Sequence, residues 1–340
     1  MNRVLAVRLD SDGDVLITGP AIRALANTAD RLDALVSPAG RAAAQLLPGI
    51  SELLTFDAPW TGYRPSAVDQ GAIRSLTRNL RRRRYSRAVI FTSFHQSPLP
   101  MALLARLAGI PFVAATSVDY PGSLLDLRHQ RPTGHEVQAA LDLAVAAGGR
   151  LPDGDDGRLR VKQVVRQKLP FEHGSYVVVH PGASVESRAI APEHGAAIVA
   201  ALVLAGWPVV VTGGPADQGL AAVVAGKVAI DLSGRTELAE LAGIIAGAAC
   251  VVVGNTGPAH LAAAVGTPVV SLFSPVVPVE RWAPYGVPSV ILGDQQMACR
   301  DSRARECPIP GHPCLSSIPP DDVVTAVAGL AEIAVVGARA

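Results

Sequence analysis

One stretch in the second half of the chain, residues 250–264, constrains the fold more than any other. Three valines follow Cys250, and they suit a parallel strand that is covered on both faces. A turn with two glycines comes next, in which Thr256 is suited to cap a helix and Pro258 to fill its first turn. Such a turn points backbone N–H groups and the positive end of a helix at one place, which favours phosphate. An ordinary strand-to-helix junction without a ligand is the alternative.

The rest of the chain alternates apolar runs with alanine-rich helical segments, in two series. The predicted strands are 3–9, 31–37, 53–56, 87–92, 110–115, 176–180, 208–212, 229–232, 250–253 and 269–273; the predicted helices are 15–28, 39–47, 73–84, 99–108, 135–147, 158–169, 192–205, 218–225 and 238–248. Residues 148–157 are rich in Gly, Asp and Pro and separate the series. With 340 residues, the chain is predicted to form two doubly wound α/β domains, 1–157 and 158–340.

Composition narrows the classes of function. The formal net charge of +1 gives no bulk field that would attract nucleic acid or a membrane. The N-terminal apolar run meets Arg8 and Asp10 too soon for a signal peptide, so the cytoplasm with reduced thiols is the expected compartment. Residues 241–275 carry no charged side chain, but Gly and Pro interrupt them, so strands and helices are favoured over a membrane span.

Two polar features have alternative interpretations. Asp14 lies near the mouth of the first strand–helix unit, where open α/β sheets bind ligands, although an Asp there can also simply cap a helix. The run Arg81-Arg82-Arg83-Arg84 could bind an acidic acceptor or a membrane surface. A solvated helix end, stabilised by the helix dipole, is the favoured interpretation of that run.

Several short motifs occur in an order that is specific as a set. They are Gly13-Asp14-Val15-Leu16 followed by Pro20-Ala21, His180-Pro181-Gly182-Ala183, Thr212-Gly213-Gly214-Pro215, Leu232-Ser233-Gly234, Asn255-Thr256-Gly257-Pro258-Ala259-His260-Leu261-Ala262, Gly266-Thr267-Pro268, and Cys307-Pro308 with His312-Pro313-Cys314-Leu315. On these motifs the chain resembles glycosyltransferase family 9, the heptosyltransferase family of lipopolysaccharide assembly, over nearly its whole length.

The resemblance implies a GT-B fold, in which two Rossmann-like domains face each other across a cleft. It implies an inverting, metal-independent transfer of a heptose or related sugar from an ADP-sugar to a glycan or small-molecule acceptor. The acceptor would bind the N-terminal half and the donor the C-terminal half. No cofactor, nucleic acid or obligate protein partner is expected. Packing of the extreme C-terminal helix on the N-terminal domain and peripheral association with the inner membrane face are left open.

The resemblance also assigns roles to residues. Asp14 matches the general base, and the expected donor-binding residues are Arg188, Asp217, Asn255, Thr256, Gly257, Pro258 and His260. Arg188 replaces a lysine of well-known members, and Asn255 replaces an aspartate, which leaves the identity of the donor sugar open. For Asp217 the alternative is a loop cap, and for His260 it is packing at the helix start. Acceptor contacts are expected from Gly13, His95 and the loops 57–70, 93–98 and 119–132.

Two alternatives to an ADP-sugar transferase remain. One is a GT-B transferase that uses a UDP- or GDP-sugar; the other is a non-catalytic protein that binds nucleotide sugars. A carboxylate at the position of Asp14 argues against the second, because a scaffold does not need it. Cys299, Cys307, His312 and Cys314 could form a zinc set, but their spacing lacks a paired C-x-x-C pattern, so buried thiols and a loop histidine are favoured.

Overall fold

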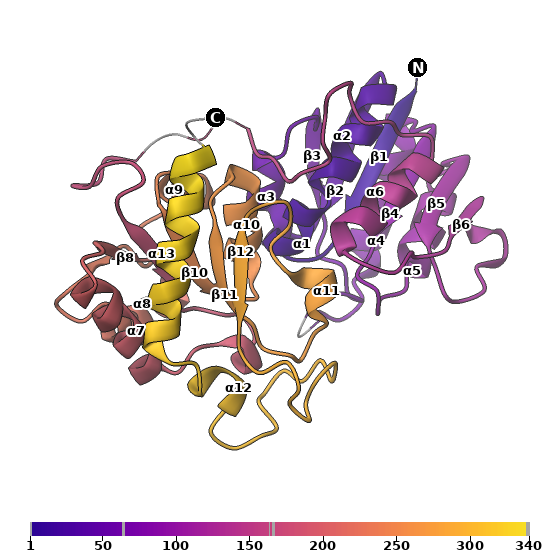
Figure 1. Ribbon diagram of the computed structural model, residues 1–340. Helices are drawn as coiled ribbons and strands as arrows, with labels where there is room; N and C mark the ends of the chain where they lie inside the picture. Colours follow the sequence, from indigo (N-terminus) through magenta and orange to yellow (C-terminus); the bar gives the residue numbers. More distant parts are fainter. Residues whose placement is uncertain (1, 63–64, 163, 165–166, 338–340) are drawn as a thin grey trace. The chain divides into compact units, whose positions relative to one another are not determined.

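The computed structural model describes residues 2–62, 65–162, 164 and 167–337. The chain divides into two compact units, Met1–Lys162 and Gln163–Ala340, called unit 1 and unit 2 below. The sequence analysis placed this boundary between residues 157 and 158. Each unit is a parallel six-stranded sheet with helices on both faces (Figure 1).

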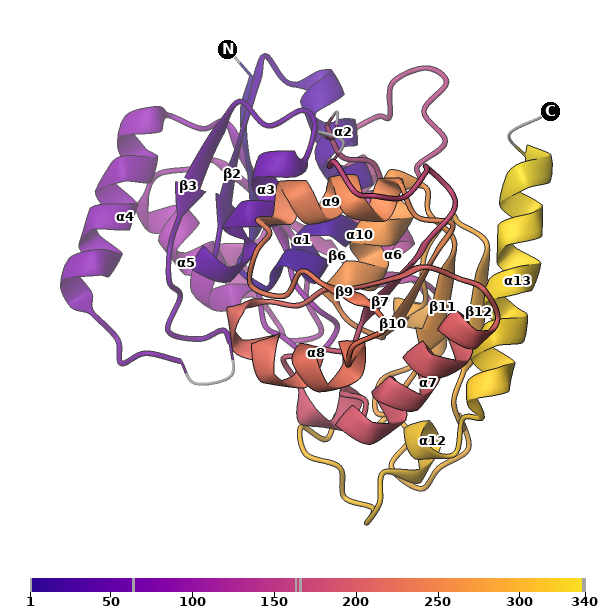
Figure 2. The ribbon, with the colours of Figure 1, turned by 90° about the vertical axis from the view of Figure 1, so that its left-hand side faces the viewer.

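Unit 1 has the strand order β3-β2-β1-β4-β5-β6. Its strands are β1 (Arg3–Arg8), β2 (Arg31–Val36), β3 (Glu52–Thr55), β4 (Arg87–Phe91), β5 (Phe112–Thr116) and β6 (Leu127–His129), and its helices are α1 (Asp12–Ile17), α2 (Gly19–Thr28), α3 (Arg41–Leu46), α4 (Gln70–Arg83), α5 (Leu99–Leu107) and α6 (Glu136–Ala146). Alternate residues of β1 explain the layers. Leu5 and Val7 belong to the core that α4 and α5 cover (Figure 2), whereas Val4 and Ala6 point to the opposite face.

Unit 2 has the order β12-β11-β10-β7-β8-β9. Its strands are β7 (Val177–His180), β8 (Val209–Val211), β9 (Ile230–Asp231), β10 (Cys250–Gly254), β11 (Val269–Leu272) and β12 (Ser289–Leu292), and its helices are α7 (Pro192–Leu204), α8 (Gln218–Ala225), α9 (Leu238–Ala246), α10 (Gly257–Val265), α11 (Val279–Trp282), α12 (Pro313–Ser316) and α13 (Pro320–Gly337). Numbered within each unit, both sheets have the order 3-2-1-4-5-6 of dinucleotide-binding folds.

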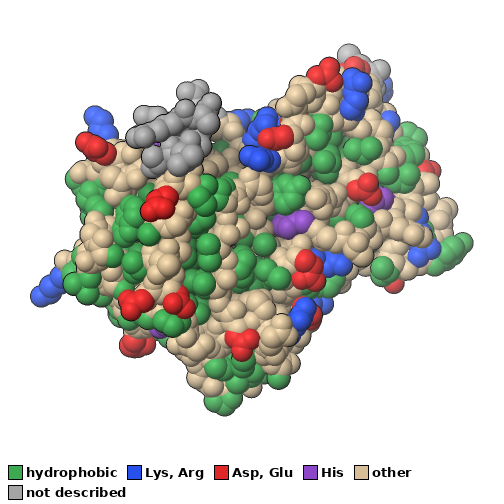
Figure 3. Space-filling model, viewed as in Figure 1, with side chains coloured by type: hydrophobic (Ala, Val, Ile, Leu, Met, Phe, Trp, Pro, Cys, Tyr) green, Lys and Arg blue, Asp and Glu red, His purple; other side chains and the backbone are tan. Residues whose placement is uncertain are grey.

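The C-terminal helix α13 packs with α7 in unit 2. Its side chains Val323, Val327 and Leu330 are buried in the core that α7 and α8 also cover. Hydrophobic side chains are frequent over α13 and the neighbouring strands on the face that Figure 3 shows. Among the described residues, one segment, 186–204, is long and apolar enough to cross a membrane. It contains α7, whose Ile198 and Leu202 lie in the same core, and about a third of the segment is buried.

The structure corrects the predicted helices at two places. The first helix begins at Asp12 rather than Val15, because the Val15 N–H bonds to the Ser11 carbonyl and closes a turn there. Residues 158–169 are not helical where they are described, since their backbone groups bond to other segments. The Lys162 N–H donates to Leu46, and the Arg158 carbonyl accepts from Arg23.

The arginine run at the end of α4 has structural contacts in unit 1. Arg83 pairs with Glu52, the first residue of β3, and Arg81 donates to the Leu107 carbonyl at the end of α5. Arg84 takes the left-handed conformation that ends the helix. These contacts agree with the interpretation of the run as a helix end.

Candidate functional site

Parallel sheets with this strand order bind ligands at a switch point, where neighbouring strands continue into helices on opposite faces. In unit 1 the switch point lies between β1 and β4, and in unit 2 between β7 and β10. The predicted base, Asp14, follows β1. The predicted donor residue Arg188 follows β7, and Asn255 to His260 follow β10. Each predicted set therefore lies at the carboxyl end of a switch-point strand.

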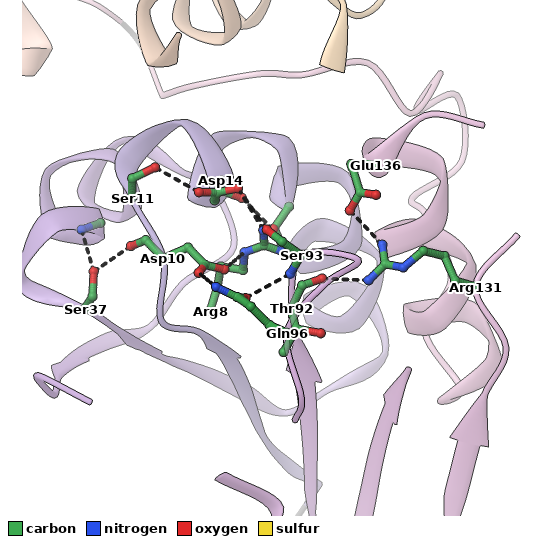
Figure 4. Close-up of polar contacts among 12 residues, drawn as sticks. Arg8, Asp10, Ser11, Asp14, Ser37, Thr92, Ser93, Gln96, Arg131 and Glu136 are labelled. Carbon is green, nitrogen blue, oxygen red and sulfur yellow. Dashed lines mark hydrogen bonds and ion pairs between the residues drawn. The ribbon is translucent and has the colours of Figure 1, made fainter. Parts of the chain in front are cut away.

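Arg8, the last residue of β1, is the centre of a buried polar network in unit 1 (Figure 4). Its Nη2 donates to Asp14 Oδ1 and to Ser93 Oγ, both at 2.9 Å. Its Nε lies 2.8 Å from Asp10 Oδ2. One guanidinium thus contacts two carboxylates and a hydroxyl that come from both switch-point strands.

Asp14 is the more accessible of these two carboxylates. Its side chain is 19% exposed, compared with 8% for Asp10. Besides Arg8, the Asp14 carboxylate accepts a hydrogen bond from Ser11 Oγ at 2.8 Å. Because Asp14 is the third residue of α1, the helix fixes its backbone. The arrangement presents a carboxylate at the surface of the switch point, which is what a general base requires.

Asp10 has a different environment from Asp14. It accepts from Gln96 Nε2 at 2.6 Å and pairs with Arg8, so both of its oxygens are engaged inside the unit. Burial raises the pKa of the Asp10 carboxyl, and the charge of Arg8 opposes that rise. Asp10 and Gln96 also line a small cavity of about 20 Å³ together with Trp60 and Ser97. This cavity brings together two of the predicted acceptor loops, 57–70 and 93–98.

The other predicted acceptor residues lie close by in unit 1. Gly13 is buried in α1 next to Asp14, and His95 is exposed in the loop after β4, with its ring against Phe94. The third loop touches the second, since Ser97 Oγ donates to Asp119. The acceptor role of His95 stays a prediction.

In unit 2, Arg188 ends a short 3-10 turn, Glu186–Arg188, after β7. A Cβ on Gly254 would lie 2.9 Å from the Arg188 carbonyl, so the glycine at the end of β10 is what allows this close approach. Ser187 anchors the turn from the other side, because it bonds to the carbonyls of Ala304 and Arg305. The loops after β7 and β10 are therefore packed together at the switch point.

The segment 256–258 forms the predicted helix start. Thr256 has the extended backbone of a cap, and Pro258 lies in the first turn of α10. The Thr256 hydroxyl makes no capping bond to the helix. Within this turn the Thr256 N–H donates to the Gly254 carbonyl, the Ala259 N–H donates to the Thr256 carbonyl, and Pro258 has no N–H. The anion site therefore stays a prediction that rests mainly on the positive end of the α10 dipole.

Asn255 is buried and holds two strands together. Its Nδ2 donates to the Ser274 carbonyl, and its Oδ1 accepts from the Ser274 N–H, each at 3.2 Å. The amide thus links the segments that follow β10 and β11 through one donated and one accepted hydrogen bond. A carboxylate cannot donate, so it would not make both bonds. This contact gives a structural reason for the amide at this position.

We expect Asn255→Ala to lower the free energy of unfolding by about 2–4 kcal/mol, because it leaves the buried N–H and carbonyl of Ser274 without these hydrogen-bond partners. Urea denaturation followed by circular dichroism measures this loss. Asn27 is the matched control, since its exposed amide makes one bond to the Arg150 carbonyl, and Asn27→Ala should change stability by less than about 0.5 kcal/mol. Equal effects of the two substitutions would contradict the structural role of Asn255.

Asp217 and His260 have contacts that favour the simpler interpretation of each. Asp217 accepts from the Gly214 N–H at 2.8 Å and so caps the 3-10 turn Pro215–Asp217. His260 is buried in α10, with its ring centroid 6.5 Å from that of Trp282. Neither contact tests donor binding, which stays a prediction for both residues. His180 is also buried; burial lowers its pKa to about 4, and its Nδ1 pairs with Thr212.

The cysteine-rich tail lies in unit 2. Cys299 and Cys314 are buried, and Cys307 is partly buried. Burial raises the pKa of the Cys314 thiol to about 11. Within the described part of the chain, no group of three or more His, Cys, Asp or Glu side chains could hold a metal ion.

Arg8, Ser93 and Gln96 were not identified from the sequence. Arg8 and Ser93 are 85 residues apart, and only the pairing of β1 with β4 brings them together. One feature of the sequence could have identified Arg8 as a site residue: it is a charged side chain at the carboxyl end of a buried strand, close to Asp10. A second buried pair, Arg131 with Glu136, lies beside this network and was missed for the same reason.

The comparisons identify the family of the chain and its fold. The model of glycosyltransferase family 9 (heptosyltransferase) matches residues 73–312, well over half of the chain. Lipopolysaccharide heptosyltransferase 3 of Escherichia coli is 32% identical over 177 residues, which are 48% of this chain and 50% of the relative. The chain spans about half the length of the curated relatives it matches.

Solved structures match over a greater length. A glycosyl transferase family 9 protein from Veillonella parvula has a TM-score of 0.77 at 17% identity and covers 97% of both chains. The E. coli ADP-heptose lps heptosyltransferase II has a TM-score of 0.71 at 19% identity over 97% of this chain and 98% of its own. TibC, an iron-containing dodecameric glycosyltransferase of enterotoxigenic E. coli, has a TM-score of 0.56 at 13% identity over 98% and 76%. At these identities the likeness shows the fold.

Proposed function

The chain belongs to glycosyltransferase family 9, and from that premise we propose that it is an inverting transferase. It moves a heptose or a related sugar from an ADP-sugar to a glycan or small-molecule acceptor. The observation that carries the proposal is the presence of complementary groups at the two switch points. Unit 1 has a carboxylate held by an arginine, and unit 2 has a helix start beside Arg188.

The proposed reaction is a single displacement. The acceptor hydroxyl attacks the anomeric carbon of the donor sugar, and Asp14 takes the hydroxyl proton as the new C–O bond forms. The bond from the anomeric carbon to the diphosphate breaks on the opposite side, and ADP leaves with both bonding electrons. Arg188 and the positive end of the α10 dipole stabilise the charge that develops on the diphosphate. The proposal requires that the two switch points face each other when both substrates are bound.

ADP is the expected nucleotide because relatives of the chain include an ADP-heptose transferase. A panel of ADP-, UDP- and GDP-sugars tests this choice, with thermal shift for binding and nucleotide release for turnover. We expect ADP-heptose to raise the melting temperature most and to release ADP when an acceptor is present. Turnover with a UDP- or GDP-sugar instead would identify the alternative transferase, and binding without turnover of any donor would identify a non-catalytic binding protein.

We expect activity to need no divalent cation. Asp10-Ser11-Asp12 resembles the Asp-x-Asp pair of metal-dependent transferases, but both carboxylates are engaged. Asp10 binds Arg8 and Gln96, and Asp12 accepts from the Ala43 N–H at 2.9 Å. Turnover of metal-stripped protein should therefore be equal with and without EDTA. Loss of activity that magnesium, manganese or iron restores would overturn this prediction.

A further inference from the structure

We propose that Arg8 is a positioning residue for Asp14: its guanidinium holds one oxygen of that carboxylate, so that Asp14 stays ionised and keeps a fixed direction toward the acceptor. The inference rests on the proposed function of Asp14 as the base. It concerns a buried side chain of β1 that reaches Asp14 through a direct ion pair at 2.9 Å.

The geometry of the contact favours arginine over any other cation. Arg8 donates from Nη2 to Asp14, and its Nε lies 2.8 Å from Asp10 Oδ2 in an ion pair, so one planar guanidinium contacts two carboxylates. Ser93 accepts from the same Nη2 and lies 3.4 Å from Asp14 Oδ1. A lysine at this position would keep the charge but could not make both contacts with one planar group.

Arg8 also supplies positive charge among several carboxylates. Asp10, from the turn after β1, and Glu136, from the start of α6, both add negative charge to this part of unit 1. Arg131 pairs with Glu136, and Arg8 forms ion pairs with both Asp10 and Asp14. A positive charge within about 4–6 Å typically lowers the pKa of a carboxyl group by about 1–3. Removal of Arg8 therefore disfavours the ionised form of Asp14.

A purely structural arginine would behave differently, and the chain supplies one for comparison. Arg23, on α2, makes two bonds to Asp155 at 2.6 and 2.8 Å and is as buried as Arg8. It ties the segment after α6 to α2 and has no contact with Asp14. Substitutions at Arg23 therefore report the general effect of breaking a buried pair.

The direct test is the titration of Asp14 itself. Protein labelled with 13C at the aspartate carboxyl carbons is followed by NMR across pH, and the Asp14 signal is identified by its loss in Asp14→Asn. We expect the titration midpoint of Asp14 to rise by about 1 unit or more in Arg8→Gln, by less in Arg8→Lys, and not at all in Arg23→Gln. An unchanged midpoint in Arg8→Gln would overturn the electrostatic part of the proposal. This readout does not need activity, so it is independent of the proposed function.

Turnover tests the geometric part of the proposal. Arg8→Lys is used here because it keeps the buried positive charge, so the variant is expected to fold. We expect Arg8→Lys to lower kcat about tenfold or more with ADP-heptose as donor, while the KM for the donor is unchanged. Arg23→Lys should leave both constants near the wild-type values. If Arg8→Lys keeps the wild-type kcat and midpoint, Arg8 does not position Asp14. If Asp14→Asn itself keeps full turnover, the proposed function fails instead.

Discussion

Asp14→Asn should lower turnover by about a hundredfold or more, the range expected for loss of a general base. The amide cannot take the proton of the acceptor hydroxyl. Its oxygen can still accept from Arg8, and its nitrogen can pair with Ser11, so the fold and the affinity for nucleotide should be retained. Release of ADP from ADP-heptose in the presence of acceptor measures the loss, and thermal melting checks the fold.

Asp12→Asn is the matched control for this experiment. Asp12 lies two residues earlier on the same helix, and its carboxylate accepts from the Ala43 N–H, which an amide oxygen also can do. We therefore expect turnover of Asp12→Asn to be close to that of the wild type. Equal turnover of the Asp14 and Asp12 variants and the wild type would remove Asp14 from the mechanism.

Arg188→Ala should weaken donor binding by about 1.5–3 kcal/mol, as for the loss of a charge-assisted hydrogen bond. This corresponds to an increase of about 10- to 150-fold in the dissociation constant, measured by titration calorimetry with ADP. The reason is the position of the Arg188 turn against the end of β10, where Gly254 allows the two loops to meet. Acceptor binding by unit 1 should not change.

Arg235 provides the control for charge. It is an exposed arginine of the same unit that follows β9, and the sheet order places β9 two strands from β7. Arg235→Ala removes the same charge away from the switch point, so we expect the affinity for ADP to change little. If both substitutions weaken ADP binding equally, Arg188 acts through the long-range electrostatic field of the unit and not through a direct contact with ADP.

The sequence was sufficient for the parts of the fold that local pattern determines. The valine runs of β7, β8 and β10 predict buried parallel strands, and the structure confirms them. The prediction missed β6 and β12, which have three and four residues, because such short strands show no clear periodicity. It also placed a helix at 158–169, where backbone groups bond instead to α2 and to the residues around α3.

The candidate site was predictable where a motif marks it and not where a distant contact builds it. Asp14 and the turn at Thr256 were found because they belong to motifs that follow strands. The partners that hold them come from elsewhere: Ser93 reaches Arg8 from β4, and Ser274 reaches Asn255 from β11. Such partners depend on which strands are neighbours in the sheet, and a single sequence does not specify that order.

The central claim is that this chain transfers a sugar from an ADP-sugar with Asp14 as the base. Mass spectrometry of a panel of glycan and small-molecule acceptors, which includes heptose-deficient lipopolysaccharide, after incubation with ADP-heptose tests it most directly. The account predicts that the wild-type protein adds one heptose per acceptor and releases an equal amount of ADP, and that Asp14→Asn adds almost none. An unmodified acceptor with ADP-heptose, together with a modified acceptor when a UDP- or GDP-sugar is supplied, would contradict the account, as would equal products from the wild type and Asp14→Asn.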